Sequence, residues 1–183
     1  MKIVIFDTET TGLLKPDDAP LEDQPKVIEF YGVAINENFE ILSELETFID
    51  PQEPLTKEIT RITGIKDSDV IGAPTFDGVA SSINLLFKDA DMAVAHNIAF
   101  DNGMMQVMYD RIGKEREMAV HQFCTVDALK PEYGRRIALG ALYKKLFGSY
   151  FKAHRAKNDV QALVRCFHHF VESGVFNLEL YQD

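Results

Sequence analysis

The chain opens with a short apolar run that leads into two acidic residues, Ile3-Val4-Ile5-Phe6-Asp7-Thr8-Glu9-Thr10-Thr11-Gly12. The β-branched and aromatic residues over 2–6 predict a buried strand. Side chains alternate along a strand, so Asp7 and Glu9 are expected to point to the same side, about 6–7 Å apart along the chain. Two like charges there need a counter-cation, and the carboxyl end of a strand is where open α/β sheets bind ligands. The stretch therefore predicts the first strand of a sheet and part of a metal site.

Hydrophobic periodicity continues this start as an α/β pattern. Residues 27–35, 41–49 and 91–95 predict further strands, and residues 139–147 and 156–172 predict helices. A helix beginning near Pro74 has the apolar stripe Phe76, Val79, Ala80, Ile83, Leu86 and Phe87. A helix capped by Asn97 has the stripe Phe100, Met104, Val107, Met108 and Ile112. Strands followed by strand–helix units predict a mixed β-sheet flanked by α-helices, with a loop over residues 15–25.

Length and composition favour one globular domain over residues 1–183. The chain has 183 residues, of which 46% are hydrophobic, enough for one sizeable core. No apolar run approaches the roughly 18 residues of a membrane span, and the N-terminus lacks the apolar stretch of a secretory signal. Cys124 and Cys166 are the only cysteines, which excludes a cysteine-based zinc site and favours two reduced thiols. We therefore expect a cytoplasmic protein without a membrane partner.

The charge distribution is uneven. The chain carries 19 basic and 29 acidic residues, a net charge of −10 that at first argues against a nucleic-acid partner. Residues 130–159 contain eight basic and two acidic residues, a local net of +6 against −16 elsewhere. This segment is either a solvated face or a surface that attracts phosphate. Two bound divalent ions would bring the net charge from −10 to −6.

Two further motifs place acidic residues at helix starts. In His96-Asn97-Ile98-Ala99-Phe100-Asp101, an apolar strand ends and Asp101 falls in the first helical turn, where a helix N-terminus stabilises negative charge. Taken alone, Asp101 also fits an ordinary first-turn acid. In His154-Arg155-Ala156-Lys157-Asn158-Asp159, the acid is in line with apolar residues at 163, 166 and 170. A charge on an apolar stripe is costly unless it is paired or bound to a metal, which favours a ligand role for Asp159.

The four carboxylates are expected to converge on one site. Oxygen-only ligands favour Mg²⁺ or Mn²⁺ over zinc. A pair of such ions about 3.5–4 Å apart stabilises the attacking and leaving oxygens in phosphoryl displacement. The candidate metal ligands are Asp7, Glu9, Asp101 and Asp159.

The three motifs resemble those of the DEDDh 3′→5′ exonuclease family and are similar to its epsilon-type proofreading members, which act with bacterial DNA polymerase. Residues 7–12, 96–101 and 154–159 match the family's three motifs in order, and the His154-to-Asp159 spacing distinguishes this branch from one that uses Tyr. The resemblance implies a ribonuclease H-like fold. Thr63-Gly64-Ile65 departs from the common His-Gly-Ile of a loop that contacts the terminal nucleotide. The polymerase-tethering tail of the epsilon proteins is expected to be missing.

This resemblance also implies the roles of individual residues. Asp7, Glu9, Asp101 and Asp159 would hold two Mg²⁺ or Mn²⁺ ions, and His154 would be the general base that releases nucleoside 5′-monophosphates from the 3′ end of single-stranded DNA. Backbone amides of Thr10, Thr11 and Gly12 would bind the terminal nucleotide, Leu13 would wedge between the last two bases, and Asn97 and Phe100 would line the nucleotide pocket. Phe100 fits a plain core position almost as well. Lys152 and Arg155 are expected to contact phosphates.

Several alternatives stay open from the sequence. An exoribonuclease of the same fold differs only in a few contacts to the 2′-OH. A catalytically silent binding or scaffold module is disfavoured by the intact acids and His154, and Mg²⁺-dependent release of mononucleotides would exclude it. An unrelated Mg²⁺ phosphatase would be excluded if a blocked 3′ end prevented cleavage of DNA. A DNA polymerase or replication complex is the expected protein partner.

Overall fold

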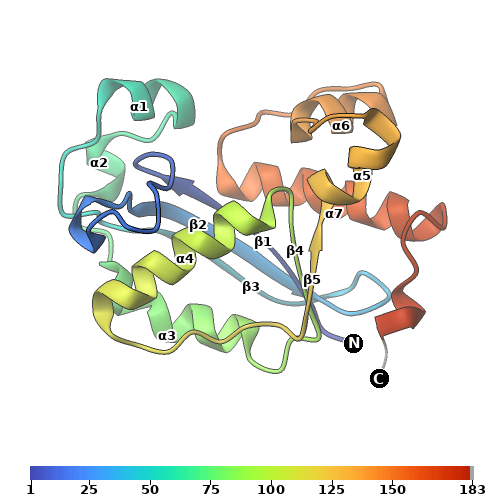
Figure 1. The fold of residues 1–183 in the computed structure, drawn as a ribbon, viewed down its shortest axis with the longest axis horizontal. Coiled ribbons are helices and arrows are strands. Elements are labelled where there is room, and N and C mark those ends of the chain that lie inside the picture. Colours follow the sequence, from blue (N-terminus) through green and yellow to red (C-terminus); the bar gives the residue numbers. More distant parts are fainter. Residues whose placement is uncertain (182–183) are drawn as a thin grey trace.

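The computed structural model describes the backbone of residues 1–181 and the side chains of these residues except 131–133. A mixed five-stranded sheet lies at its centre (Figure 1). Its strands, in spatial order, are β3 (Ile41–Phe48), β2 (Val27–Ile35), β1 (Ile3–Thr10), β4 (Met92–Ala95) and β5 (His121–Cys124). The first two pairings, β3 with β2 and β2 with β1, are antiparallel, whereas β1–β4 and β4–β5 are parallel. The predicted α/β class with a mixed sheet is confirmed.

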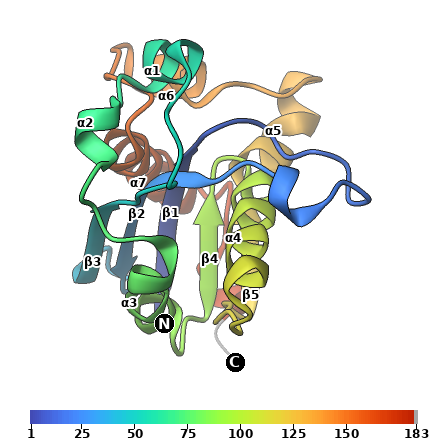
Figure 2. The same cartoon turned by 90° about the vertical axis from the view of Figure 1, so that its left-hand side faces the viewer.

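Helices cover both faces of this sheet. Those that pack on one face are α3 (Phe76–Phe87) and α4 (Ile98–Ile112), while α7 (Ala156–Glu172) and α6 (Leu139–Phe147) lie on the other, as Figure 2 shows. Shorter helices complete the chain: α1 (Lys57–Thr63), α2 (Asp67–Val70) and α5 (Thr125–Tyr133), with 3₁₀ turns at Leu21–Asp23 and Leu178–Tyr181. Among the described residues, no helix combines the length and apolar character needed to cross a bilayer.

The alternation of side chains along β1 divides the core in two and positions the acids. Val4 and Phe6 are fully buried against α3 and α4, and Ile3 and Ile5 are fully buried on the α7 face. Because side chains alternate, Asp7 and Glu9 continue the row that faces α7, and Thr8 continues the row that faces α4. One strand thus presents functional groups to both helical layers.

Most expected elements are found, and β1 is longer than predicted. The apolar residues at 2–6 indicated its start, but the strand runs through Asp7, Glu9 and Thr10 because β2 pairs with it along this whole length. The parallel partner β4 pairs only with Ile3–Ile5. The acids therefore lie within the strand, beyond the end of β4, instead of following the strand.

The structure differs from expectation in four short elements and in the buried face of α4. Four short elements, α1, α2, β5 and α5, were not predicted from the hydrophobic pattern of the sequence. In α4 the buried stripe includes Met105 and Tyr109, whereas Phe100 and Val107 are only half-buried. Tyr109 is accommodated because its hydroxyl donates to the Ala80 carbonyl at 2.9 Å and to Asn84 Oδ1 at 2.7 Å.

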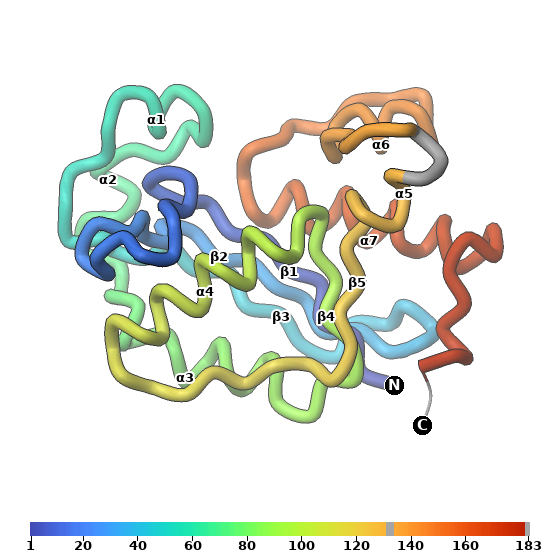
Figure 3. The backbone as a smooth tube through the Cα atoms, viewed as in Figure 1, coloured from blue at the N-terminus to red at the C-terminus, as the bar shows by residue number. Residues whose placement is uncertain are grey.

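The segment between β1 and β2 packs on α4, and Figure 3 traces its course. A Cβ at position 103 would lie 2.6 Å from a methyl carbon of Leu14, so a larger residue there would displace the Leu14 side chain from the helix. The Arg111 guanidinium donates to the carbonyls of Leu21, Gln24 and Pro25. These contacts fix the segment that follows Leu13, consistent with the expected loop.

Candidate active site

Three carboxylates from two elements meet at the α7 face of the sheet. Oxygens of Asp7, Glu9 and Asp159 all lie within 4.8 Å of one another. Asp7 and Glu9 come from β1, and Asp159 comes from the first turns of α7, which packs across that strand. Segments about 150 residues apart in sequence are thus joined at one point, as the sequence motifs predicted.

Asp159 also caps its own helix. Its Oδ2 accepts a hydrogen bond from the backbone N–H of Arg155 at 3.1 Å, which satisfies one of the free donors at the start of α7. The helix N-terminus additionally favours negative charge there. The side chain is therefore held in the cluster by its own helix.

Asp101 reaches the site from the opposite helical layer. It is 3% exposed, and its Oδ1 accepts the backbone N–H of Thr8 at 3.1 Å and the Thr8 hydroxyl at 2.8 Å. The structure therefore brings Asp101 to the strand that carries Asp7 and Glu9, although it lies outside the group of three whose oxygens are mutually within 4.8 Å. Its charge still acts on Asp7.

Burial raises the pKa values of all four acids, and repulsion from neighbouring acids adds to this effect at Asp7 and Glu9. Burial, followed by the charges of Asp101 and Asp159, raises the pKa of Asp7 well above its ordinary value. Burial and the Asp159 charge raise the pKa of Glu9 to about 8. Burial raises the pKa of Asp101 to about 7 against the opposing effect of the Thr8 hydrogen bonds, and burial also raises the pKa of Asp159. The site disfavours its own ionisation in the absence of a cation.

The donor set fits a hard divalent cation. Its ligands would be carboxylate oxygens alone, the class that Mg²⁺ and Mn²⁺ prefer. Partly buried carboxylates that repel one another gain most from a nearby positive charge. Asp7, Glu9 and Asp159 are the residues placed to hold such an ion, and Asp101 is the residue nearest to them from α4.

His154 directly precedes α7 and is exposed. Its backbone is left-handed, with φ of 65°, which is uncommon for a residue other than glycine. Its imidazole lies near enough to Asp159 to lower the pKa of that carboxyl when charged. The structure therefore places the expected base near Asp159.

Arg155 is engaged by a carboxylate that the sequence motifs did not identify. Glu29 of β2 is 1% exposed and accepts hydrogen bonds from Arg155 Nε at 3.1 and 3.2 Å and from Nη2 at 2.8 Å. The phosphate contact expected of Arg155 would have to compete with this ion pair. The signal for Glu29 was present, because it is the one charged residue in the apolar run Val27–Ile35.

In the segment at the end of the first motif, some groups expected to contact a nucleotide are already hydrogen-bonded and one is free. The Thr11 N–H donates to the Lys26 carbonyl at 2.8 Å, so this amide, expected to bind nucleotide, is already used in joining β1 to β2. The Thr10 hydroxyl donates to the Gly12 carbonyl at 2.7 Å. Leu13 is 80% exposed, which leaves its side chain free for the wedge role predicted for it.

Polar side chains of the second motif lie at the end of β4. The Arg136 guanidinium donates to Asn97 Oδ1, and Asn97 occupies the N-cap position of α4 without a side-chain cap bond. His96 bridges Thr125 Oγ1 at 2.8 Å and the Ile137 carbonyl at 2.9 Å, and burial lowers its pKa. A neutral imidazole that donates from Nε2 fits both contacts. Phe100 is half-buried and packs against the α3–α4 core.

Lys152, in the basic segment of residues 130–159, is exposed. Lys152 lines a cavity of about 260 Å³ between α6 and α7, together with Tyr143, Phe151, Asn158, Gln161, Ala162 and Arg165. Other cations of the segment are engaged: Lys157 pairs with Glu46, and Lys144 contacts the Tyr150 hydroxyl. The phosphate contact expected of Lys152 stays a prediction.

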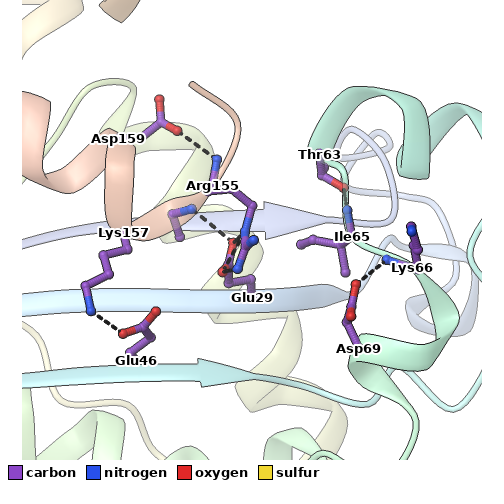
Figure 4. Close-up of polar contacts among 10 residues, drawn as sticks. Glu29, Glu46, Thr63, Ile65, Lys66, Asp69, Arg155, Lys157 and Asp159 are labelled. Carbon is purple, nitrogen blue, oxygen red and sulfur yellow. Dashed lines mark hydrogen bonds and ion pairs between the residues drawn. The ribbon is translucent and has the colours of Figure 1, made fainter. Parts of the chain in front are cut away.

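Thr63 occupies the position at which the family commonly has histidine, and its hydroxyl makes its hydrogen bonds locally, at the end of α1. Its hydroxyl donates to the Ile59 carbonyl at 2.9 Å and accepts the Ile65 N–H at 3.1 Å. Figure 4 shows Thr63 across from Arg155 and Asp159. With both bonds made internally, Thr63 closes α1, and a nucleotide contact from this position would require these bonds to break.

The structure thus combines a mixed sheet with acidic residues on β1, α4 and α7 and a histidine before α7. The exonuclease family RNase_T matches residues 4–167, and the chain belongs to this family.

Relatives of similar sequence are much longer proteins. The chain is 31% identical over 189 residues to DNA polymerase III PolC-type of Halalkalibacterium halodurans, covering 100% of this chain and 12% of that protein. It is 34% identical over 159 residues to the PolC-type polymerase of Listeria monocytogenes, covering 86% of this chain and 10% of the relative. The chain thus spans about a tenth of the length of these relatives.

Solved structures share the fold. The nuclease domain of 3′hExo, a DEDDh family member bound to rAMP, has a TM-score of 0.77 at 18% identity, covering 95% of this chain and 93% of that one. Exonuclease X in complex with 5′ overhanging duplex DNA has a TM-score of 0.71 at 19% identity, covering 97% and 95%. The predicted ribonuclease H-like architecture is confirmed by these similarities.

Proposed function

We propose that the protein is a metal-dependent 3′→5′ exonuclease that removes nucleoside 5′-monophosphates from the 3′ end of single-stranded DNA. The observation that carries this proposal is the meeting of Asp7, Glu9 and Asp159 within 4.8 Å, with His154 at the start of the helix that bears Asp159. Membership of the exonuclease family and similarity to PolC-type polymerases support it.

Two Mg²⁺ or Mn²⁺ ions would supply Lewis acidity and charge neutralisation at the scissile phosphate. Asp7, Glu9 and Asp159 would hold them from the α7 face, and Asp101 would complete the set from α4. His154 takes the proton from the water that attacks the terminal phosphodiester, since an exposed imidazole next to the cluster is placed to accept it. Leu13 separates the last two bases, and Asn97, Phe100 and the amide of Gly12 contact the terminal nucleotide. Lys152 attracts the phosphate of the strand entering the site.

An exoribonuclease is the second candidate. The structure of 3′hExo bound to rAMP and that of a 3′-exonuclease recognising a histone mRNA stem-loop share this fold, at TM-scores of 0.77 and 0.73. RNA is distinguished from DNA by contacts to the 2′-OH, and one or two such contacts suffice. The polymerase relatives favour DNA as the first candidate.

We also propose association with a DNA polymerase. The support is that the matching segments of the relatives form about a tenth of PolC-type polymerases. Co-purification with the replicative polymerase from the source cell, followed by reconstitution with the purified subunit, tests it.

Matched 5′-labelled single-stranded DNA, duplex DNA and RNA of one sequence test the activity. With Mg²⁺, we expect a ladder of products shortened from the 3′ end on single-stranded DNA and mononucleotides as the released product. A 3′-terminal phosphorothioate linkage should block the ladder, and Asp7→Asn is the matched inactive control. Preferential degradation of RNA would support the exoribonuclease, and internal cleavage would contradict both candidates.

A further inference from the structure

A fifth carboxylate lies beside the cluster in a different role. Glu29 is 1% exposed in the middle of β2 and pairs in register with Glu9 of β1, so both side chains face α7. Its oxygens are bound by the Arg155 guanidinium and by the backbone N–H of Ala156, which donates to Oε2 at 3.0 Å. Figure 4 shows this arrangement between β2 and the start of α7.

Glu29 binds the two residues at which α7 begins. Arg155 is the N-cap of α7 and Ala156 is its first residue. Three residues further on, Asp159 enters the carboxylate cluster and accepts the Arg155 N–H. One residue before Arg155, His154 has its backbone in the left-handed region. Both groups that the third motif supplies to the site therefore stand next to the point that Glu29 holds.

We infer that Glu29 is a positioning residue that sets Asp159 and His154 against Asp7 and Glu9 by fixing the start of α7 to β2. This inference rests on the proposed function of the same site. Arg155 is the partner that neutralises Glu29 and keeps it from joining the metal ligands. Its guanidinium also lies over the Phe48 ring of β3, 5.1 Å from the ring centroid, so its direction is fixed from a second strand.

Stability alone is a poor reason for this arrangement. A largely buried ion pair loses much of its attraction to desolvation, and well-packed apolar residues of the same volume are often as stable. What the pair provides is geometry, since a guanidinium fork and a backbone amide define the direction of one carboxylate. Residues that orient metal ligands in this way typically change activity or metal affinity about 10–100-fold when replaced.

The competing role for Arg155 is direct contact with a substrate phosphate. If Arg155 contacts a phosphate, its replacement raises the Michaelis constant and flattens the salt dependence of binding. If the Glu29–Arg155 pair positions α7, its loss lowers kcat and metal affinity and leaves the salt dependence unchanged. The two roles therefore predict different measurements on the same variants.

The test uses Glu29→Gln, Arg155→Lys and the double variant, with Glu46→Gln as the matched control. Glu46 makes the neighbouring ion pair between β3 and α7, with Lys157, at the exposed surface (Figure 4). We expect both single variants to lower kcat about 10–100-fold with a Michaelis constant within about twofold of the parent. The double variant should be no less active than either single variant, because both substitutions break the same contact. Glu46→Gln should match the parent.

Mn²⁺ binding without substrate, followed by the spin signal of the free ion, gives a readout besides activity. We expect weaker binding in Glu29→Gln and Arg155→Lys and parent-like binding in Glu46→Gln. If Glu29→Gln fails to fold, Arg155→Lys carries the comparison, because the Arg155 side chain is 35% exposed. Thermal unfolding establishes which variants are folded.

Parent-like kcat and Mn²⁺ affinity in folded Glu29→Gln would overturn the inference. So would a raised Michaelis constant and a flatter salt dependence in Arg155→Lys with unchanged kcat, which would return Arg155 to phosphate binding. A parent protein without nuclease activity would overturn the proposed function alone, and Mn²⁺ binding by the variants would still decide the role of Glu29.

Discussion

Thr8 and Asp101 are joined by two hydrogen bonds to one oxygen, from the Thr8 backbone N–H at 3.1 Å and from its hydroxyl at 2.8 Å. The strand β4 pairs with β1 only at Ile3–Ile5, so the Asp101 carboxylate takes up a β1 donor beyond the end of that pairing. The same residue on β1 that separates Asp7 from Glu9 thus anchors the acid of α4.

Replacing the Thr8 hydroxyl should loosen Asp101. We expect Thr8→Val to lower nuclease activity about 10–100-fold, the range for residues that orient ligands, while the backbone bond from position 8 persists. Thr8→Ser keeps the hydroxyl and is the matched control. Equal kcat values for Thr8→Val and the parent, measured at saturating Mg²⁺ and substrate, would contradict this role.

Removing one carboxylate should abolish activity without loss of fold. Asp7→Asn and Asp159→Asn keep the size of the side chain, and Asn at 159 still offers an oxygen to the Arg155 N–H. We expect no detectable cleavage, an unfolding temperature in EDTA at or above that of the parent, and no further rise on adding Mg²⁺. A lower unfolding temperature in both variants would mean that the acids are structural.

Stability without metal should fall as the pH rises from about 5 to about 8. Glu9 has an ordinary pKa of 4.5 and a folded pKa of about 8, so the folded state binds the proton more tightly than the unfolded state. This contribution to stability is complete below about pH 4.5 and is lost as the pH passes 8. Glu9→Gln should flatten the dependence of unfolding temperature on pH in EDTA, and identical slopes would refute the assignment.

Loss of the His154 imidazole should affect chemistry more than binding. We expect His154→Asn to lower kcat about 10²–10⁴-fold with little change in the Michaelis constant. Asparagine tolerates the left-handed backbone of this position, so the fold is preserved. Mn²⁺ affinity provides the control, because it should stay at the parent value. A variant with full kcat would place the base elsewhere.

The exposed Lys152 should contribute to the salt dependence of binding. A phosphate contact adds about 0.7 to the slope of log affinity against log salt for a single strand, so Lys152→Ala should reduce the slope by that amount. Lys88, whose carbonyl accepts Lys2 Nζ near the start of β1, lies away from the acids and is the matched control. A fluorescent oligonucleotide titrated with Ca²⁺ at four salt concentrations measures both, and an unchanged slope for Lys152→Ala would exclude the contact.

The sequence predicted the acids of the site better than their supports. Asp7, Glu9 and Asp159 could be found because each breaks an apolar pattern or repeats at the spacing of its element. Glu29 breaks an apolar strand in the same way, but its meaning depends on Arg155, 126 positions away, and no local period connects them. Such pairings arise only from the packing of α7 across the sheet.

Helices and strands were likewise predicted best where a local pattern in the sequence marks them. Two periodic segments, Leu139–Phe147 and Ala156–Glu172, were predicted at their observed bounds, and the helix expected to begin near Pro74 begins at Phe76. The four-residue strand β5 and the helix α5 that follows it are set by pairing with β4 and by the bonds of His96 to Thr125 and Ile137. These are tertiary contacts that the sequence alone does not reveal.

Because side chains alternate along β1, the site can form only when β1 and β2 pair in the correct register. A slip of one residue between β1 and β2 would turn Asp7 and Glu9 toward α4 and Thr8 toward α7, and both connections of the strand would be lost together. Catalytic competence thus demands a correctly aligned hairpin before either helix can contribute its acid. Single-residue insertions or deletions near the irregularity between Glu9 and Thr10 should therefore silence the enzyme even where the chain still collapses into a sheet.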